Sequence, residues 1–261
     1  MVLENLISIE RIRKRPVLPF LLGILYASLS LFAAIFLFPD DLILFATALT
    51  SLLFLPTINR LLEIEKGIEL KRNNFGLGNF FKDHKDVFKI YLCIFLGIII
   101  TFIVFSLLSP VEIFPSGPLV FSDFFTIIGN NIKVLIVAYL ASYFFGTGAI
   151  FIIAWNASIW GAVFGSFLRS AAFATAQNPV LFFIILGISV LPYLIIEASA
   201  YFLAGISGGI VSRATISENI YSKNFEVIIK KSLFILWLSL FLIFISAIIE
   251  SQLAPLVLGL L

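Results

Sequence analysis

The stretch LPYLIIEASAYFLAGISGG, residues 191–209, decides the fold class. It is apolar throughout except for Glu197, and the nearest basic residue, Arg213, is sixteen positions away. Apolar runs of about eighteen or more residues are typical of transmembrane helices. A charged side chain at bilayer depth costs at least ~3 kcal/mol. The stretch therefore predicts a membrane-spanning helix with one buried acid that is either functional or structural.

The composition of the whole chain indicates an integral membrane protein. Of its 261 residues 61% are hydrophobic and 12% are charged, whereas soluble domains have roughly a quarter of their residues charged. The mean hydropathy of +1.13 leaves no room for a soluble domain, and the lipid bilayer is the expected surrounding. The basic residues are spread among loops, so nucleic acid is not an expected partner. The single cysteine, Cys93, allows no intrachain disulfide.

The apolar runs predict an all-α, polytopic bundle of six or seven transmembrane helices. Residues 1–15 form a basic interfacial segment, 16–250 a single transmembrane domain, and 251–261 a short tail. Residues 59–89 and 213–231 are its two hydrophilic loops. The seven expected spans are Pro16–Phe38, Leu42–Leu62, Phe88–Leu108, Asn130–Trp155, Ala157–Thr175, 180–212 and Ser232–Ile249.

The basic residues predict the orientation of these spans. Segments 1–15, 59–89 and 213–231 hold four, seven and four Lys/Arg residues, which is 15 of the 17 in the chain. The positive-inside rule places all three segments, and the N-terminus, in the cytoplasm. The loop Ser109–Asp123 contains no basic residue and is expected outside. Seven crossings satisfy this arrangement, whereas it fails if Ala157–Thr175 is a re-entrant hairpin.

The sixth span is too long for a bilayer. At ~1.5 Å per residue, residues 180–212 form a helix of about 50 Å, against a hydrocarbon core of ~30 Å. The helix must tilt, protrude or break, and we expect breaks at Pro192 and at the glycine cluster Gly205–Gly209.

Five polar residues within or next to the spans are candidates for a functional or structural polar core. They are Glu197, Asn156, Asn131, Asn130 and Arg169. Asn130 at the start of its span can cap a helix, and Asn156 can bond a neighbouring helix for ~1 kcal/mol. Glu197 lies near mid-depth and must be protonated, paired or hydrated. Arg169 and Asn156 are its expected partners.

Small residues recur at four-residue spacing in two spans. One row comprises Ala157, Gly161 and Gly165, and the other comprises Ala200, Ala204 and Gly208, with Gly205 and Gly209 beside it. Such rows let a second helix approach closely. We expect the fifth span to pack against the sixth through these rows, although a homo-oligomer interface is also open.

The sequence does not favour an enzyme. Gly205-Ile206-Ser207-Gly208 matches the serine motif of rhomboid-type intramembrane proteases, but such a serine needs a general base within hydrogen-bonding reach. The only histidine, His84, is in a loop well before Ser207. One histidine and one cysteine cannot build a zinc site, and no glycine-rich phosphate loop is present. No metal and no cofactor is expected.

Two stretches together resemble a known family. They are NNIKVLIVAYLASYFFGTGAIFIIAWNASIWGAVFG, residues 130–165, and LPYLIIEASAYFLAGISGGIVSRA, residues 191–214. The chain resembles the stage II sporulation protein M (DUF95-type) family over roughly residues 90–250. The matching positions are Asn131, Asn156, Gly161, Pro192, Glu197 and Gly209.

This sequence departs from the family pattern in three places. Tyr193-Leu194 replaces a histidine–glycine pair, Glu197 is displaced slightly, and Ala157 stands where glycine is usual. The resemblance implies a helical membrane protein. The family member in sporulating bacteria looks like a membrane scaffold that holds cell-wall hydrolases at the engulfing membrane, so the resemblance also implies a scaffold role.

Two functional hypotheses follow. The first is a non-enzymatic scaffold or subunit of a membrane complex, with protein partners docking on 59–89 or Ser109–Asp123. The second is a small-solute, proton-coupled or lipid transporter in which Glu197 lines a hydrated cavity with Asn131 and Asn156. The sequence shows no second acid within a span and no inverted repeat, which argues against a transporter. A water-filled cavity at Glu197 would favour transport, whereas a sealed carboxyl would favour a structural role.

Overall fold

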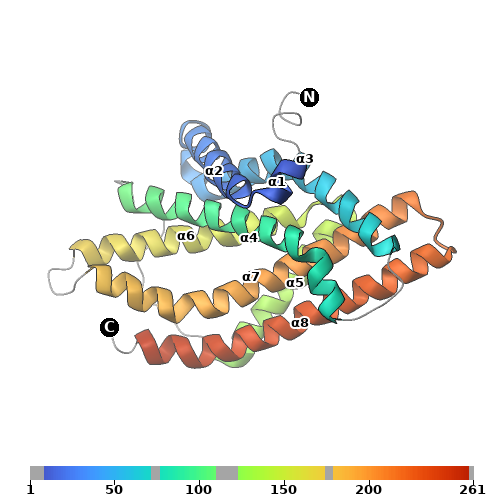
Figure 1. The fold of residues 1–261 in the computed structure, drawn as a ribbon. Helices are drawn as coiled ribbons and strands as arrows, with labels where there is room; N and C mark the ends of the chain where they lie inside the picture. Colours follow the sequence, from blue (N-terminus) through green and yellow to red (C-terminus); the bar gives the residue numbers. More distant parts are fainter. Residues whose placement is uncertain (1–8, 72–76, 110–122, 174–178, 259–261) are drawn as a thin grey trace.

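The computed structural model describes residues 9–71, 77–109, 123–173 and 179–258, and every regular element in these residues is a helix (Figure 1). The helices are α1 (Ile9–Lys14), α2 (Val17–Leu37), η2 (Pro39–Asp41), α3 (Leu42–Lys71), α4 (Leu77–Leu108), α5 (Phe124–Phe145), α6 (Ala149–Phe173), α7 (Pro179–Ser217) and α8 (Lys223–Leu258). The predicted all-α class is confirmed.

Seven helices of the described chain, α2 to α8, are long and apolar enough to cross a membrane. They include α6, whose apolar window Ala149–Ser170 has 22 residues, so this segment has the length of a full crossing. The prediction of six or seven spans is therefore confirmed. Successive spans alternate in direction. The start of α2, the end of α3 and the α7–α8 hairpin lie at one end of the bundle, called here the basic end.

The expected boundary between the fourth and fifth spans is wrong. Helix α5 begins seven residues before Asn131, because Asp123 caps it by accepting hydrogen bonds from the backbone nitrogens of Phe125 (3.0 Å) and Thr126 (3.3 Å). It ends at Gly146, whose φ of 73° is left-handed. Asn130 and Asn131 thus lie inside α5, and Asn156 lies inside α6. The sequence did not predict the turn at Gly146, because its residues are uncharged and do not interrupt the apolar run.

The segment 59–89 is helical over most of its described length. Helix α3 continues to Lys71 and α4 begins at Leu77, so the predicted loop consists mainly of helix extensions at the basic end. Helix α1 packs beside them: Ile12 is buried in the core, and Arg13 forms an ion pair with Asp86 of α4 at 3.4 Å. Residues 1–8 of the predicted interfacial segment and residues 110–122 of the predicted outer loop are outside the described residues.

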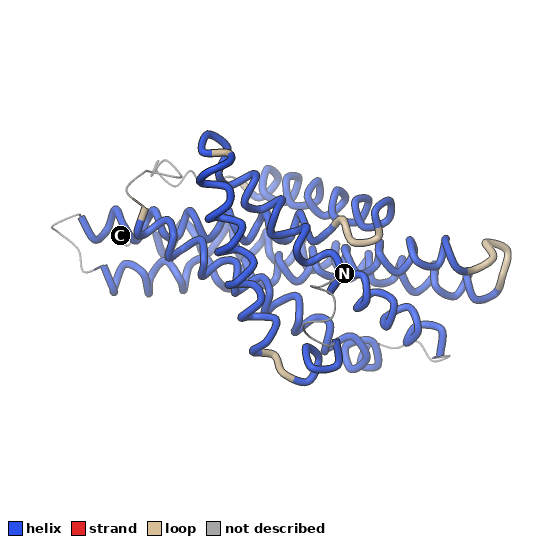
Figure 2. The backbone as a smooth tube through the Cα atoms, turned by 90° about the horizontal axis from the view of Figure 1, so that it is seen from above, coloured by secondary structure: helices blue, strands red, loops and turns tan. Residues whose placement is uncertain are grey.

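Helix α7 accommodates its length by protruding, not by breaking. It is one continuous helix of 39 residues with Pro192 inside it, so the expected breaks at Pro192 and Gly205–Gly209 are absent. The hairpin that α7 forms with α8 reaches beyond the other helices at the basic end, as two views show (Figures 1 and 2). The glycine cluster serves packing, and the proline ring is tolerated within the helix.

The glycine row of α6 packs on α4. A Cβ on Gly161 would lie 2.6 Å from the carbonyl oxygen of Ile99, and one on Gly165 would lie 2.6 Å from that of Ile103. Ala157 in the same row is fully buried. The expectation that this row packs against the sixth predicted span, α7, is therefore wrong. Parallel α4 and α6 approach through their backbones, which only small residues allow.

The small residues of α7 face α5 and the start of α6. A Cβ on Gly208 would lie 2.3 Å from the carbonyl oxygen of Tyr139 in α5, and one on Gly205 would lie 2.5 Å from Cβ of Ala149 in α6. Gly209 faces Leu62 of α3 and the turn at Gly146. Ala200 and Ala204 are fully buried, in one cluster with Leu135 of α5. The row thus fixes α7 as the central helix of the bundle.

A third close approach joins α2 to α4. The Cβ of an alanine at Gly97 would lie 2.4 Å from the carbonyl oxygen of Phe20 and 3.0 Å from Cα of Gly23. Both atoms belong to backbone, so neither can move away without shifting the helix. This contact holds α2 and α4 together about a third of the way along α2.

We predict that Gly97→Ala destabilises the protein by roughly 1–3 kcal/mol, since an inserted methyl group must push two backbones apart. Gly129→Ala is the matched control, because a Cβ there meets no atom within 4 Å and alanine favours the helix. Thermal melting of both variants in lipid nanodiscs checks this. Equal melting temperatures for the two variants would contradict the packing described.

Candidate functional site

Glu197 is the centre of the polar core, and the structure encloses it. Its residue is only 6% exposed, within the apolar part of α7. Its carboxyl oxygen Oε1 accepts a hydrogen bond of 2.7 Å from the hydroxyl of Tyr201. The two residues are four positions apart, which puts them on one helix face. The helix therefore supplies its own partner to the buried acid.

The expected partners of Glu197 are bonded elsewhere. The Asn156 amide donates to the carbonyl oxygen of Ile152 in its own helix at 2.9 Å. The Arg169 guanidinium donates to the carbonyl oxygen of Ser109, the residue that follows α4. Arg169 is thirteen residues, or about 20 Å, further along α6 than Asn156. The expectation that Arg169 or Asn156 pairs with Glu197 is wrong, because Arg169 reaches the end of the bundle instead of its middle.

A second acid approaches Glu197 from α8. The Ser207 hydroxyl bonds the Ser232 hydroxyl at 2.7 Å, and the Ser246 hydroxyl donates to the Tyr193 carbonyl oxygen at 3.2 Å. Tyr193 and Ser207 are as far apart on α7 as Ser232 and Ser246 are on α8. The two helices therefore run antiparallel in fixed register. Side chains in a helix lean toward its N-terminus, so Glu197 and Glu250 lean toward each other at the level of Tyr193.

Glu197 lies one turn after Tyr193 on α7 and Glu250 one turn after Ser246 on α8, so the Ser246–Tyr193 hydrogen bond lies between the two acids. The apolar span of α8 extends to Leu253 and so includes Glu250, which is half-buried. The last helix is therefore longer than the predicted span, which ended at Ile249. Glu250 was placed at the membrane surface because the last span was expected to end at Ile249.

Asn131 brings an amide to the same level of the bundle. It lies on the inward face of α5, in line with buried Ile127 and Leu135. Leu135 belongs to one apolar cluster with Ala200 and Tyr201, and α5 and α7 are parallel, so Asn131 lies one turn earlier, at the level of Glu197. Its Nδ2 atom is buried without a hydrogen-bond partner in the described structure. Asn130, its neighbour, is on the exposed face of α5.

The site thus consists of two carboxyls, two tyrosines and an amide between α5, α7 and α8. Sequence inspection missed Tyr193, Tyr201 and Glu250. The spacing of Glu197 and Tyr201 was the available signal, since a phenol one turn away is a natural partner for a buried carboxyl. The arrangement can hold a proton or stabilise helix contacts. Ser207, from the protease-like motif, bonds Ser232 and so joins α7 to α8.

The fold and this core define the class: a polytopic helical membrane protein with a polar cluster inside its bundle. The sequence model of stage II sporulation protein M matches residues 42–255, which is most of the chain. The protein belongs to the stage II sporulation protein M family. No curated protein and no solved structure matches it.

We predict that Tyr201→Phe lowers the free energy of unfolding by about 1 kcal/mol, because it removes a hydrogen bond inside the membrane and leaves the carboxyl unpaired. Tyr193→Phe is the control, because the Tyr193 hydroxyl has no hydrogen bond to any described residue. Tyr193→Phe should lower the free energy of unfolding by less than half as much as Tyr201→Phe. Reversible unfolding in mixed micelles measures both changes, and equal losses would show that the Glu197–Tyr201 bond is not the cause.

Proposed function

We propose that the protein is a non-catalytic scaffold or subunit of a membrane complex in the plasma membrane of a prokaryotic cell. In this proposal the basic end faces the cytoplasm, as the Lys/Arg distribution predicts. The bundle holds its helices in fixed positions, and surfaces outside the membrane bind protein partners.

The enclosure of Glu197 is the observation that carries this proposal. A carboxyl that is 6% exposed and bonded to a tyrosine of its own helix matches a structural role better than a site in contact with water. The close backbone contacts at Gly97, Gly161 and Gly208 support it, because they leave these helices little freedom to move against one another. Ser207 supports the non-catalytic part, since its hydroxyl is used in a bond to Ser232.

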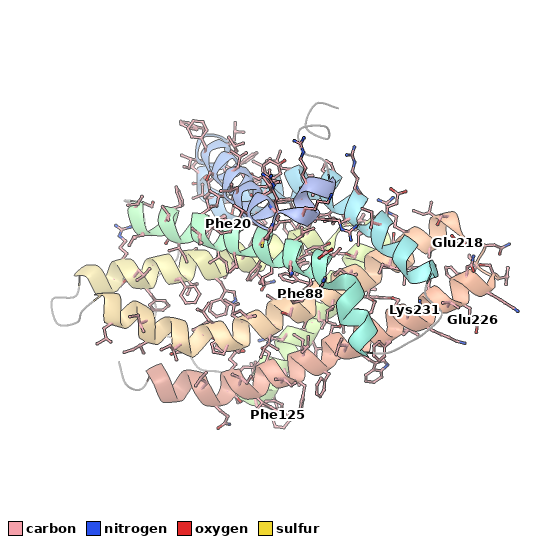
Figure 3. All side chains as sticks on the ribbon, viewed as in Figure 1. Phe20, Phe88, Phe125, Glu218, Glu226 and Lys231 are labelled. Carbon is pink, nitrogen blue, oxygen red and sulfur yellow. The ribbon has the colours of Figure 1, made fainter. Side chains whose placement is uncertain are left out.

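The tip of the α7–α8 hairpin is the docking surface that the described residues support. It extends past the other helices, with Glu218 and Glu226 near its end (Figure 3). Tyr221 is 97% exposed and Ile216 is 81% exposed. In the proposed orientation these apolar side chains face the cytoplasm, where large exposed apolar groups mark protein interaction sites.

The hairpin is anchored at its base and internally braced. The Arg213 guanidinium of α7 donates to the side-chain oxygen of Asn59 in α3. Lys230 forms an ion pair of 2.5 Å with Glu226 one turn away. A rigid projecting tip loses little conformational entropy when it binds a partner, which favours docking.

We predict that a photo-crosslinking residue at Tyr221 captures one defined protein in the native membrane. The control position is Val137, which is 50% exposed on the lipid-facing side of α5 and should capture none. Ile216→Asp together with Tyr221→Asp should lower co-purification of that protein at least tenfold without changing the melting temperature, since neither side chain is buried. Purification of the wild-type chain alone from native lipid, with no crosslink at Tyr221, would contradict the scaffold.

We also infer a second candidate function, proton-coupled transport of a small solute or lipid. Two observations support it: Glu197 and Glu250 lie on either side of the Ser246–Tyr193 hydrogen bond between α7 and α8, and the buried amide of Asn131 has no partner in the described residues. Ionisable residues inside a membrane-spanning bundle often mark proton pathways.

Glu197→Gln separates the two functions, because the amide keeps the acceptor for Tyr201 but holds no exchangeable acid proton. A scaffold predicts normal melting, normal partner binding and no proton flux above empty liposomes for both proteins. A transporter predicts wild-type flux in reconstituted liposomes and at least a tenfold loss in Glu197→Gln and in Glu250→Gln, with melting unchanged. Such a loss would replace the scaffold by the transporter as the main function.

A further inference from the structure

Helix α5 carries a row of exposed side chains whose first half is polar. The helix lies at the edge of the bundle, since only 17% of its span is buried, the lowest share among the seven candidate spans of the described chain. Members of the row are three or four positions apart and so share one helix face. They are Thr126, Asn130, Lys133, Val137, Leu140 and Phe144. The half nearest the start of α5 is therefore polar, and the half nearest the basic end is apolar.

Lys133 lies near the middle of this membrane-spanning helix. It is nine residues, about 14 Å, from Phe124 at the start of α5 and twelve residues, about 18 Å, from Phe145 at its end. The 22 residues of α5 rise about 33 Å, which is close to the ~30 Å of a hydrocarbon core. A charged side chain that faces lipid at such depth costs at least ~3 kcal/mol. The ammonium group of Lys133 therefore requires an anionic partner.

The described part of the chain supplies no such partner. Lys133 and Asn130 are both exposed, and neither forms a hydrogen bond or an ion pair with a described residue. The nearest acid on α5, Asp123, is ten residues or about 15 Å from Lys133, and its carboxyl caps the start of the helix. Glu197 lies on α7, which packs against the opposite, inward face of α5. The anion that neutralises Lys133 therefore comes from outside the protein.

The ammonium group of Lys133 and the carboxamide of Asn130 are directed at the same place. Residues three positions apart are neighbours on a helix surface. Side chains lean toward the helix N-terminus, so Lys133 covers the turn that holds Asn130 and extends toward the membrane surface opposite the basic end. Gly129 leaves open space in that turn, since a Cβ there meets no atom within 4 Å. Two convergent N–H donors, one of them charged, favour an oxygen-rich anion.

A phospholipid phosphate fits this position better than a partner helix does. Helix interfaces in membranes are rich in small residues, as the contact at Gly161 is in this bundle. The apolar half of the row on α5 is bulky instead: Val137, Leu140 and Phe144 are 50%, 42% and 69% exposed. Such side chains suit contact with acyl chains. A lysine that snorkels toward the surface and a locally thinned bilayer together bring a headgroup phosphate within reach.

We propose that Lys133 and Asn130 bind the phosphate of one phospholipid, drawn inward in the leaflet opposite the basic end. Both side chains donate hydrogen bonds to phosphate oxygens, and the acyl chains lie along the apolar half of the row. The bilayer is locally thinner beside the first half of α5. The recognised group is the phosphodiester that common phospholipids share. Asn131 is on the opposite face of α5, so the site is independent of whether the protein is a scaffold or a transporter.

A spin label beside the site measures where the phosphate lies. Gly129→Cys in a Cys93→Ala background places a nitroxide in open space, and the full-length protein is studied in phosphatidylcholine nanodiscs. The label's enhancement of phosphorus-31 relaxation should fall at least threefold in Lys133→Met. It should stay near wild type in Lys133→Arg, because arginine also donates to phosphate. The matched control is a label at Val137→Cys, one turn deeper, where Lys133→Met should have little effect.

Native mass spectrometry gives a second measurement that needs no label. The probes are phosphatidylcholine and diacylglycerol with identical chains, so that only the phosphate-bearing headgroup differs. The wild type should retain phosphatidylcholine at least fivefold better than Lys133→Met does, whereas diacylglycerol should be retained equally poorly by both. Lys85→Met is the control, because it removes another exposed lysine, at the basic end of α4. Melting temperatures should be unchanged, since neither lysine is buried.

Three results would overturn the proposal. The first is equal phosphorus-31 relaxation and equal lipid retention in the wild type and Lys133→Met. The second is displacement of the bound lipid by millimolar inorganic phosphate, which would identify a site for a free anion. The third is a change of oligomeric state in Lys133→Met, which would identify a partner helix with an acidic side chain as the occupant.

Discussion

The close contact of helix backbones at glycine is the interaction on which this bundle depends. Inside a bilayer, lipid tails are as apolar as leucine, so helices gain little by burying apolar side chains against each other. What remains is van der Waals contact, which is strongest where no Cβ separates the backbones. Gly97, Gly161 and Gly208 provide such contacts in three helix pairs: α2 with α4, α4 with α6, and α5 with α7. With Gly205 of α7, which faces Ala149 of α6, they connect α2 to α7 through the bundle.

This packing explains how an acid is tolerated in α7. Close neighbours exclude water from Glu197, so the carboxyl cannot be solvated and needs a partner within the protein. Tyr201 meets that need from the same helix, whatever small shifts the neighbouring helices make. The small residues Ala200 and Ala204 beside it let α5 approach, which brings Asn131 to the same level. The rigid core and the polar cluster are therefore parts of one arrangement.

The sequence predicted the number and class of the helices well, because hydropathy depends only on which residues are in lipid. It failed where the outcome depends on tertiary partners. Four-residue spacing identifies a small-residue row, but not which helix it meets: the row of Gly161 meets α4, not α7. Likewise a buried acid requires a partner, but the sequence alone does not show which one. Arg169 lies about 20 Å beyond Asn156 along α6, at the end of the bundle. The turn at Gly146 was missed because uncharged residues do not interrupt an apolar run.

The polar core and the cleft that lies between the α2–α3 hairpin, α4 and α6 differ in their relation to the family. The matched residues, 42–255, include all of α5 and α7 and most of α8, Glu250 among them. The polar core therefore lies wholly within the family region. The cleft combines matched helices, α4 and α6, with α2, which precedes the match. Its bottom is the Gly23–Gly97 contact, where one glycine is inside the matched region and the other outside it. The cleft therefore depends on how α2, which precedes the match, docks on the family bundle at Gly23 and Gly97, whereas the polar core is built from α5, α7 and α8 alone.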